Sequence, residues 1–420
     1  MRYISILLLI IPASLMAQYQ CVDGRYMQDP LFSAADIWIS PNVLYASAYD
    51  QNGVLRDLML DVYQPATTVD PLEARPLVIM VHGGGLLGGD KGSQLSVFLC
   101  TELAKRGYVA ASVNYRLGWQ QLGTCNGDTA SLSRARYRAQ QDVHAAIRFL
   151  EEKSGEYLID TNYIFMAGSS VGATLSLLAA FSSEEDYDPM LVEELGALDS
   201  NGNPYADHDR AIAGVFGTGI GMDKPWLLDR NDTPVMCFHG TCDFTVPYVE
   251  GPLFYCYEPV QYINFYGSRY LADHMRETGH PYRIYTNERG GHDAVDSLTL
   301  LEQAIPFLRS VLCEEPESKE IYEFHVDGCI VNRMDSVELD IHPNPVQEVL
   351  SVTIGSGSTG TAVIEIFNSI GQQVLYYEEA FYAPVREMEI ILPPAMEERG
   401  IYFLRVRIQE SVGMETFMKW

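Results

Sequence analysis

From residue 43 to residue 312 the chain alternates between two patterns of apolar positions. Unbroken apolar runs, such as PLVIMVHGGG at 76–85 and YIFMAGSS at 163–170, are typical of strands that are buried on both faces. Between such runs lie segments like RARYRAQQDVHAAIRFLEEK at 134–153, whose apolar residues recur three and four positions apart and predict amphipathic helices. Strands that alternate with helices favour a mostly parallel sheet with helices on both faces. The predicted fold class is therefore α/β.

The same patterns place the other elements of this region. An antiparallel pair of strands opens it at 43–49 and 55–63, with turn residues at 51–53 between them. The stretch 183–210 shows no regular pattern, and we expect it to be irregular. Further strands are predicted at 108–115, 211–219, 234–243 and 282–292, and further helices at 97–107, 171–181, 270–278 and 297–312.

The pattern changes after residue 312. Residues 314–336 are charged and contain proline, and we expect a linker or a short bridging segment there. From residue 337 to residue 420 short strand patterns follow one another without a long helical segment, separated by turns rich in Gly, Ser, Asn and Pro. This succession predicts a second domain, a small all-β sandwich.

The N-terminus has the composition of a secretory signal peptide. Arg2 is followed by an apolar run at 4–11 and by mainly small residues that end at Ala17. The run is too short to span a membrane, and no later segment is long and apolar enough to do so. Cleavage after Ala17 is preferred over lipidation of Cys21, because the residues before that cysteine are neither small nor aliphatic. The expected order is a signal peptide at 1–17, an α/β domain at 18–313, the linker at 314–336 and the β domain at 337–420.

Composition narrows the classes of function. The chain has 420 residues, of which 47% are hydrophobic and 20% charged, so it has ample material for the cores of two domains. Its formal net charge of −28 argues against binding to nucleic acid or anionic lipid, because both require clustered Lys and Arg. Eight cysteines in an exported chain predict disulfide bonds, whose pairing the sequence leaves open. Their spacings are not those of zinc sites, so no metal is predicted.

The strongest chemical signal is Gly168-Ser169-Ser170-Val171-Gly172, a G-x-S-x-G motif between a predicted strand and a predicted helix. The two glycines allow a very tight turn, which exposes the hydroxyl of Ser170 at the start of the helix. The N-terminus of a helix also favours the negative charge that develops there during acyl transfer. Ser170 is therefore the predicted nucleophile.

A serine hydroxyl needs a general base, and the base needs an orienting acid. Among nine histidines, His292 fits best because it follows the last predicted strand of the sheet and precedes the last helix. Asp243 follows the preceding strand, and the order Ser170, Asp243, His292 is the chain order of an α/β-hydrolase triad. Asp293 and Asp296 are rival acids, but a close neighbour in sequence seldom points at the far nitrogen of the same ring.

Acyl transfer also requires hydrogen-bond donors for the oxyanion. The glycine triplet at 83–85 follows the first predicted parallel strand, where its backbone N–H groups can turn toward the site. Val171, next after the nucleophile, supplies another N–H group. Of the remaining histidines, His82 is expected to brace the glycine loop and His239 to lie within a strand.

These features together resemble the carboxylesterase and hormone-sensitive-lipase-like branch of α/β hydrolases, over residues 43–312. The pieces that carry the resemblance are VHGGG at 81–85, GGDK at 88–91, VNYRLG at 113–118 and QDV at 141–143. The resemblance implies an α/β-hydrolase fold and an oxyanion hole formed by Gly84, Gly85 and Val171. Val171 stands where the family usually has a small residue, and Ala173 stands where glycine is common. We expect both departures to leave the mechanism intact and to narrow the acyl pocket.

Residues 337–420 resemble the C-terminal sorting domain of the type IX secretion system of Bacteroidetes. The matching pieces are IHPNP at 341–345, IFNSIG at 366–371, GIYFLRV at 400–406 and FMKW at 417–420. The resemblance implies the type IX secretion machinery as a partner, passage through the outer membrane, removal of the domain, and release or attachment at the cell surface. The alternative is an accessory sandwich such as a carbohydrate-binding module, for which no aromatic platform stands out.

The sequence thus predicts a secreted serine hydrolase that cleaves carboxylic esters through an acyl-enzyme, with no cofactor. A serine peptidase of the same fold and a non-catalytic surface binding protein are the alternatives. Export of the chain points to acetyl or feruloyl esters on polysaccharides as substrates. As walls of the substrate cleft we consider the stretch 183–210, Tyr248 and Tyr255.

Overall fold

The computed structural model describes most of the chain. The described residues are 24–120, 128–199, 203–205, 212–254, 263–293, 295–324, 337–356, 360–368, 372–381, 385–393, 396, 399–408 and 411–420. The predicted signal peptide at 1–17, as well as Cys21 and Tyr255, lies outside them. No helix within the described ranges is both long and apolar enough to cross a membrane.

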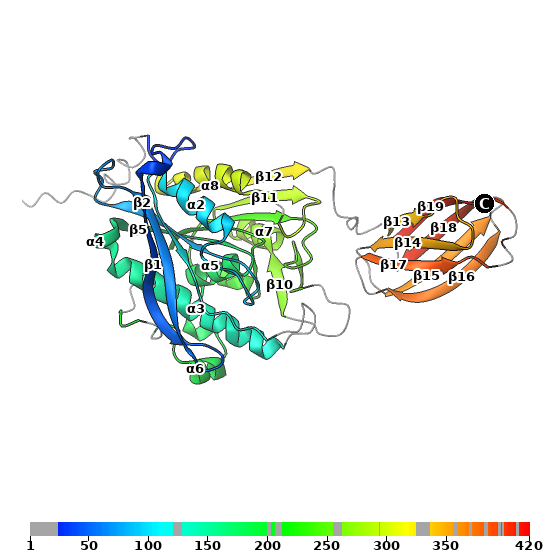
Figure 1. Ribbon diagram of the computed structural model, residues 1–420, viewed down its shortest axis with the longest axis horizontal. Helices are drawn as coiled ribbons and strands as arrows, with labels where there is room; N and C mark the ends of the chain where they lie inside the picture. The colour runs from blue at the N-terminus through cyan, green and yellow to red at the C-terminus, as the bar shows by residue number, and fades with distance from the viewer. Residues whose placement is uncertain are drawn as a thin grey trace, which may run out of the picture.

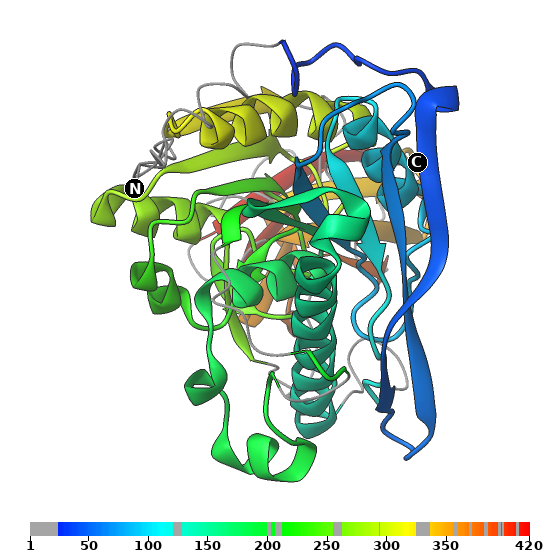
Figure 2. The same cartoon turned by 90° about the vertical axis from the view of Figure 1, so that its left-hand side faces the viewer.

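A nine-stranded sheet forms the centre of the α/β region (Figure 1). In order across the sheet its strands are β1 (Ile37–Tyr49), β2 (Leu55–Pro65), β4 (Val109–Val113), β3 (Arg75–Val81), β5 (Ile159–Ser169), β6 (Ile212–Thr218), β8 (Val235–Gly240), β11 (Tyr282–Glu288) and β12 (Lys319–Phe324). From β4 to β12 all neighbours run parallel, whereas β2 is antiparallel to both β1 and β4. Figure 2 shows β1 and β2 as a long hairpin along one side of the domain.

Helices cover both faces of this sheet, as the alternating pattern predicted. One face packs against α2 (Gln94–Ala104) and α8 (Ser297–Leu312). The other packs against α3 (Thr129–Glu152), α5 (Val171–Phe181) and α7 (Ser268–Thr278). The central strands have apolar side chains on both faces, and every residue of β3 and β4 is buried for that reason.

Smaller elements lie between these parts. They are the short helices α4 (Ser154–Tyr157) and α6 (Pro189–Leu195), the 3-10 turns η1 (Ala34–Asp36), η2 (Glu184–Asp186) and η3 (Pro225–Arg230), and a small sheet of β7 (Gly221–Met222), β10 (Asn264–Gly267) and β9 (Glu250–Pro252). The stretch 183–210, predicted to be irregular, contains η2 and α6. Asp188 caps α6 by accepting a hydrogen bond from the N–H of Met190, and Pro189 occupies its first turn.

The expected linker is wrong for residues 319–324, which form the edge strand β12 of the large sheet. Glu320 on this strand accepts hydrogen bonds from Arg269 at 3.0 Å and from Arg276 at 3.1 Å. Ile321 packs against the core beneath α8. The charges that resembled a solvated linker therefore form ion pairs along a sheet edge, where charged residues commonly protect unpaired backbone.

The C-terminal region consists of two antiparallel sheets, as expected of a β-sandwich. One contains β13 (Val337–His342), β14 (Val349–Ser356) and β17 (Val385–Ile391), and the other contains β16 (Gln373–Phe381), β15 (Gly360–Asn368), β18 (Gly400–Ile408) and β19 (Ser411–Lys419). Apolar residues from both sheets form a single buried core. This core is separate from the two cores of the α/β region.

Candidate active site

Ser170 lies in the sharp turn between β5 and α5. Its backbone has φ of 54° and ψ of −124°, a conformation that residues with a side chain rarely adopt. Three hydrogen bonds hold the turn: the N–H of Ser170 donates to the carbonyl of Thr218 at 2.8 Å, and its carbonyl accepts from the N–H groups of Ala173 at 2.9 Å and Thr174 at 3.1 Å. The strained turn places the serine side chain at the N-terminus of α5.

The two glycines of the motif are required by close backbone contacts. A Cβ atom on Gly168 would lie 2.3 Å from the carbonyl carbon of Gly172, and one on Gly172 would lie 2.1 Å from the carbonyl oxygen of Val81. Neither position has room for a methyl group. The G-x-S-x-G spacing therefore follows from how closely β5 and α5 approach each other and the end of β3.

The structure brings Ser170, His292 and Asp243 together from three separate loops. Nε2 of His292 lies 2.9 Å from Oγ of Ser170 and can accept its proton. Nδ1 of His292 lies 2.6 Å from Oδ2 of Asp243 and donates to it. The Asp243 side chain is fully buried, whereas 26% of the His292 side chain is exposed. This is the geometry of a serine nucleophile with an oriented general base.

The loops that follow β8 and β11 are fastened to each other, which fixes the distance between acid and base. The N–H of Cys242 donates to the carbonyl of Gly290 at 2.9 Å, and the N–H of Arg289 donates to Oγ1 of Thr241 at 2.8 Å. A Cβ atom on Gly240 would lie 2.0 Å from the carbonyl oxygen of Gly290. The loop that carries Asp243 is therefore held directly against the loop that carries His292.

Electrostatics favour an ionised acid and a basic histidine. Burial by itself raises the pKa of Asp243, but hydrogen bonds from His239 and His292 outweigh burial and hold the pKa well below its usual range. Burial lowers the pKa of His292, whereas its hydrogen bond to Asp243 and the charges of Asp243 and Asp293 raise it, with a net rise. Both directions suit a general base that becomes an imidazolium during the reaction.

The two rival acids have other surroundings. Asp296 is the N-cap of α8, where its carboxylate accepts hydrogen bonds from the N–H groups of Leu298 and Thr299. Asp293 affects His292 only through its charge. Asp243 is the carboxylate that faces the far nitrogen of the His292 ring.

Two residues near the triad were not predicted from sequence. Nε2 of His239, at the end of β8, lies 3.0 Å from Oδ2 of Asp243, although we expected only a strand residue there. Gly219, after β6, has φ of 59°, and a Cβ atom on it would lie 2.8 Å from Cε1 of His292. The spacing of four residues between His239 and Asp243 was visible in the sequence, but nothing in it marked that pair as different from other histidines near aspartates.

The glycine loop after β3 lies against the nucleophile turn. A Cβ atom on Gly83 would lie 3.0 Å from the carbonyl oxygen of Ser169. Gly84 has φ of 112°, and a Cβ atom on it would lie 2.1 Å from the carbonyl oxygen of Gly88, so only glycine fits there. Gly85, with φ of 61°, lines the same pocket as Ser170.

Side chains from the neighbouring motifs brace this loop. The rings of His82 and Tyr115 stack with centroids 4.3 Å apart, and the hydroxyl of Tyr115 donates to the carbonyl of His82 at 2.9 Å. His82 thus has the bracing position expected of it. The next residue, Arg116, forms a buried ion pair with Asp142 of α3 at 2.7 Å, which ties the end of β4 to that helix.

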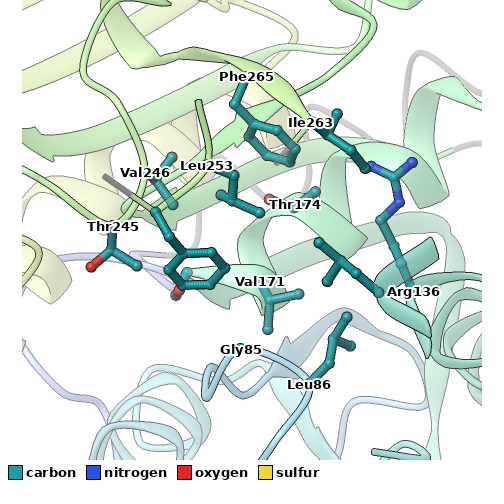
Figure 3. Close-up of a pocket in the computed structure, with 13 residues that line it drawn as sticks. Gly85, Leu86, Arg136, Val171, Thr174, Thr245, Val246, Leu253, Ile263 and Phe265 are labelled. Carbon is teal, nitrogen blue, oxygen red and sulfur yellow. The ribbon is translucent and has the colours of Figure 1, made fainter. Parts of the chain in front are cut away.

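A small apolar cavity of about 30 Å³ lies beside Ser170 (Figure 3). Its lining residues are Gly85, Leu86, Leu132, Arg136, Ser170, Val171, Thr174, Thr245, Val246, Leu253, Phe254, Ile263 and Phe265. In Figure 3 Leu86 and Val171 lie on one side and Leu253 and Phe265 on the other. Phe254 stacks on Trp119, with ring centroids 5.1 Å apart.

Of the cleft walls proposed from sequence, those that the structure describes are not part of this cavity. Tyr248 does not line it, and its hydroxyl is hydrogen-bonded to Oγ1 of Thr286 at 2.7 Å. None of the described residues between 183 and 210 lines it either. The residues that do so come mainly from the glycine loop, α3, α5 and the segments around β9 and β10.

Some of the described cysteines form disulfide bonds, as expected, and others are free thiols. Cys242 and Cys313 each take part in a disulfide bond. Cys100 and Cys237 are buried free thiols, and burial raises the pKa of Cys237 to about 12. Across the described ranges, no group of three or more His, Cys, Asp or Glu side chains is arranged to hold a metal ion.

The fold and the site together define an α/β hydrolase. Ser170 follows β5, Asp243 follows β8 and His292 follows β11, which is the chain order of the three residue types in an α/β-hydrolase triad. Residues 60–217 match the BD-FAE family model, and residues 340–419 match the model of a secretion system C-terminal sorting domain. Residues 60–217 are therefore similar to an esterase-like α/β-hydrolase domain, and residues 340–419 are similar to a C-terminal sorting domain of the type IX secretion system.

Several solved structures are similar to part of this chain. A truncated carbohydrate esterase from gut microbiota is 18% identical, with 68% of this chain and 98% of that chain covered and a TM-score of 0.47. Esterase 2 of Thermogutta terrifontis in a propionate-bound structure is 20% identical, with 66% and 96% covered and a TM-score of 0.44. Esterase B of Lactobacillus rhamnosis with a tributyrin phosphonate is 17% identical, with 72% and 92% covered and a TM-score of 0.43. No curated protein sequence matches the chain.

Proposed function

We propose that this protein hydrolyses carboxylic esters of short acyl groups through a covalent acyl-enzyme on Ser170. The observation that carries the proposal is the unbroken chain of hydrogen bonds from Ser170 to His292 to Asp243. In the first step His292 accepts the proton of the Ser170 hydroxyl as its oxygen attacks the ester carbonyl. The same ring then gives this proton to the departing alcohol, and a water activated by His292 releases the acid.

Backbone N–H groups would stabilise the oxyanion that forms on the ester carbonyl. Gly84, Gly85 and Val171 are the proposed donors, because the glycine loop lies against the nucleophile turn and Val171 is the first residue of α5. Residues in the left-handed conformation turn their amides in directions that regular strands cannot provide. Loss of one such donor typically lowers turnover by about 10²–10³.

The cavity beside Ser170 supports a short acyl group. About 30 Å³ corresponds to room for roughly two water molecules, a size that suits an acetyl group rather than a feruloyl group. Its walls are almost entirely apolar, which favours an uncharged acyl chain. Because the sorting domain indicates export to the cell surface or beyond, acetyl esters on extracellular polysaccharides are the proposed substrate class.

The first test is hydrolysis of p-nitrophenyl acetate, butyrate and octanoate by the protein and by its Ser170→Ala variant. We expect activity on acetate that exceeds activity on octanoate, and a fall of about 10⁶-fold in the variant. Hydrolysis of acetylated xylan is then compared with hydrolysis of methyl ferulate, which distinguishes the acetyl from the feruloyl group that the sequence analysis named. No hydrolysis and no labelling of Ser170 by a fluorophosphonate would leave a non-catalytic binding protein, whereas labelling without ester hydrolysis would leave a serine peptidase. Either outcome would refute the proposal.

A further inference from the structure

The carboxylate of Asp243 has more hydrogen-bond donors than a triad requires. Oδ1 accepts from the backbone N–H groups of Thr245 at 2.8 Å and Val246 at 3.0 Å. Oδ2 is shared by two histidines, His292 at 2.6 Å and His239 at 3.0 Å. The second histidine has no part in proton transfer to Ser170, so its presence on the acid needs a separate explanation.

The surroundings of His239 fix its ring and its proton. The ring is 1% exposed, and Nε2 faces two acceptors, Oδ2 of Asp243 and the carbonyl oxygen of Val246 at 3.1 Å. Nε2 must therefore carry a proton. On the other side Nδ1 lies 2.7 Å from Oγ of Ser268, whose hydroxyl also lies 3.2 Å from the carbonyl oxygen of Ile220. With either orientation of that hydroxyl, Nε2–H donates toward Asp243.

We propose that His239 is a positioning residue, which holds the carboxylate of Asp243 in place and so sets both the orientation and the basicity of His292. This inference rests on the proposed serine-hydrolase function. Through His239 and Ser268, the acid is tied to the first residue of α7 and to the segment after β6. Without this tie only the short turn at 243–246 and His292 itself would hold the carboxylate.

The physical effect on His292 has a definite sign. A donor to the carboxylate spreads its negative charge and weakens its attraction for a proton on His292. Removal of the His239 donor concentrates that charge on the remaining bond to His292, and the pKa of His292 should rise. Since only neutral His292 can accept a proton, the acidic limb of the activity profile should move to higher pH.

Other charged and titratable groups near the two rings do not replace this donor. Asp293 acts on His292 through its charge alone. Around His239, Tyr248 meets the ring edge-on at a centroid distance of 5.6 Å, and its hydroxyl is bonded to Thr286. Cys237 on the same strand is hydrogen-bonded to Ser268, and Arg269 interacts with Tyr248 and Cys237.

The experiment compares two substitutions at His239 with a matched control. His239→Met removes the donor at similar volume, whereas the amide nitrogen of His239→Gln reaches about as far as Nε2 and can still donate. His144→Met is the control, because His144 is likewise 1% exposed and bonded to an aspartate, Asp199, but lies on α3 away from the triad. The readouts are kcat and KM on p-nitrophenyl acetate, the pH dependence of fluorophosphonate labelling of Ser170, and the titration of His292 followed by NMR of histidine-labelled protein.

We expect His239→Met to lower kcat about tenfold with little change in KM, and to raise the pKa of His292 by about one unit. His239→Gln and His144→Met should retain the wild-type pH profile. An unchanged His292 titration in His239→Met would overturn the inference. A His239→Gln variant whose kcat and His292 titration change as much as those of His239→Met would also overturn it. If His239→Met does not fold, Ser268→Ala, which frees the ring, should shift the titration in the same direction, and no shift there would overturn the inference.

These readouts separate the inference from the proposed function. A wild-type protein that neither hydrolyses esters nor labels at Ser170 refutes the function, whereas the NMR titration of His292 still tests the effect of His239. An active wild-type enzyme with an insensitive titration refutes the inference alone.

Discussion

The proposed acyl pocket gives a prediction with a definite magnitude, through the side chain of Val171. This residue follows the nucleophile directly, and its side chain forms part of the wall of a cavity of about 30 Å³. Val171→Ala removes two methyl groups from the wall and leaves the backbone N–H group, the proposed oxyanion donor, in place. The substitution should therefore change which acyl chains fit and not how the ester carbonyl is activated.

The magnitude follows from the area of acyl chain that the wider cavity can bury. Each additional methylene that is removed from water contributes about 0.8 kcal/mol. At about 1.4 kcal/mol for each factor of ten in rate, one methylene is about fourfold in kcat/KM and two are about fifteenfold. We expect the ratio of kcat/KM for p-nitrophenyl butyrate over acetate to rise by about 4- to 15-fold in the variant.

The matched control is Val62→Ala, which removes the same two methyl groups from β2, where the side chain is fully buried in the core. It should lower stability and leave the chain-length ratio unchanged. A Val171→Ala variant whose ratio stays at the wild-type value would show that Val171 does not limit the acyl chain. A large fall in acetate turnover in Val171→Ala would contradict the idea that the side chain affects only which acyl chains fit, while the backbone N–H group alone stabilises the oxyanion.

Two further predictions concern the nucleophile turn and the pH dependence. Gly172→Ala places a Cβ atom 2.1 Å from the carbonyl oxygen of Val81. The substitution should lower the free energy of unfolding, measured by thermal unfolding, by about 1–3 kcal/mol or more, and it should remove most of the activity. Gly155→Ala, on α4 with nothing within 4 Å of the added atom, is the control and should be neutral or stabilising. The pKa of His292 is raised, so kcat/KM should fall on the acidic side with an apparent pKa above 6.5, because protonated His292 cannot accept the serine proton. A profile measured from pH 5 to 9 that stays flat down to pH 6 would contradict that assignment.

The parts of the fold and site that could be predicted from sequence are those with a local signature. The apolar runs of β3 and β5 identify buried strands because both faces of a central strand need apolar residues. Parallel strands that alternate with helices bring their C-terminal ends to one edge of the sheet. Ser170, Asp243 and His292 each follow such a strand, so their meeting could be predicted before any distance was known.

The parts that could not be predicted depend on contacts between segments far apart in the chain. β12 has a charged sequence, and only its pairing with β11 and the position of Glu320 beside Arg269 distinguish it from a solvated linker. His239 lies in a buried strand, and the sequence does not distinguish a ring that contacts Asp243 from one that faces an apolar core. The walls of the cavity beside Ser170 come from several loops, and no pattern in the sequence showed which residues line it.

Some glycines are visible in the sequence and also mark long-range contacts, because they lie where two loops approach more closely than a methyl group allows. Gly219 leaves room for the ring of His292, and Gly240 lets the acid loop lie against Gly290 of the base loop. Neither glycine belongs to the G-x-S-x-G motif, yet each fixes a distance on which proton transfer depends. The family match at 60–217 ends before Gly219, and so before the acid and the base. In that half of the site, glycines at the loop contacts leave the room that lets Nε2 of His292 lie 2.9 Å from Oγ of Ser170.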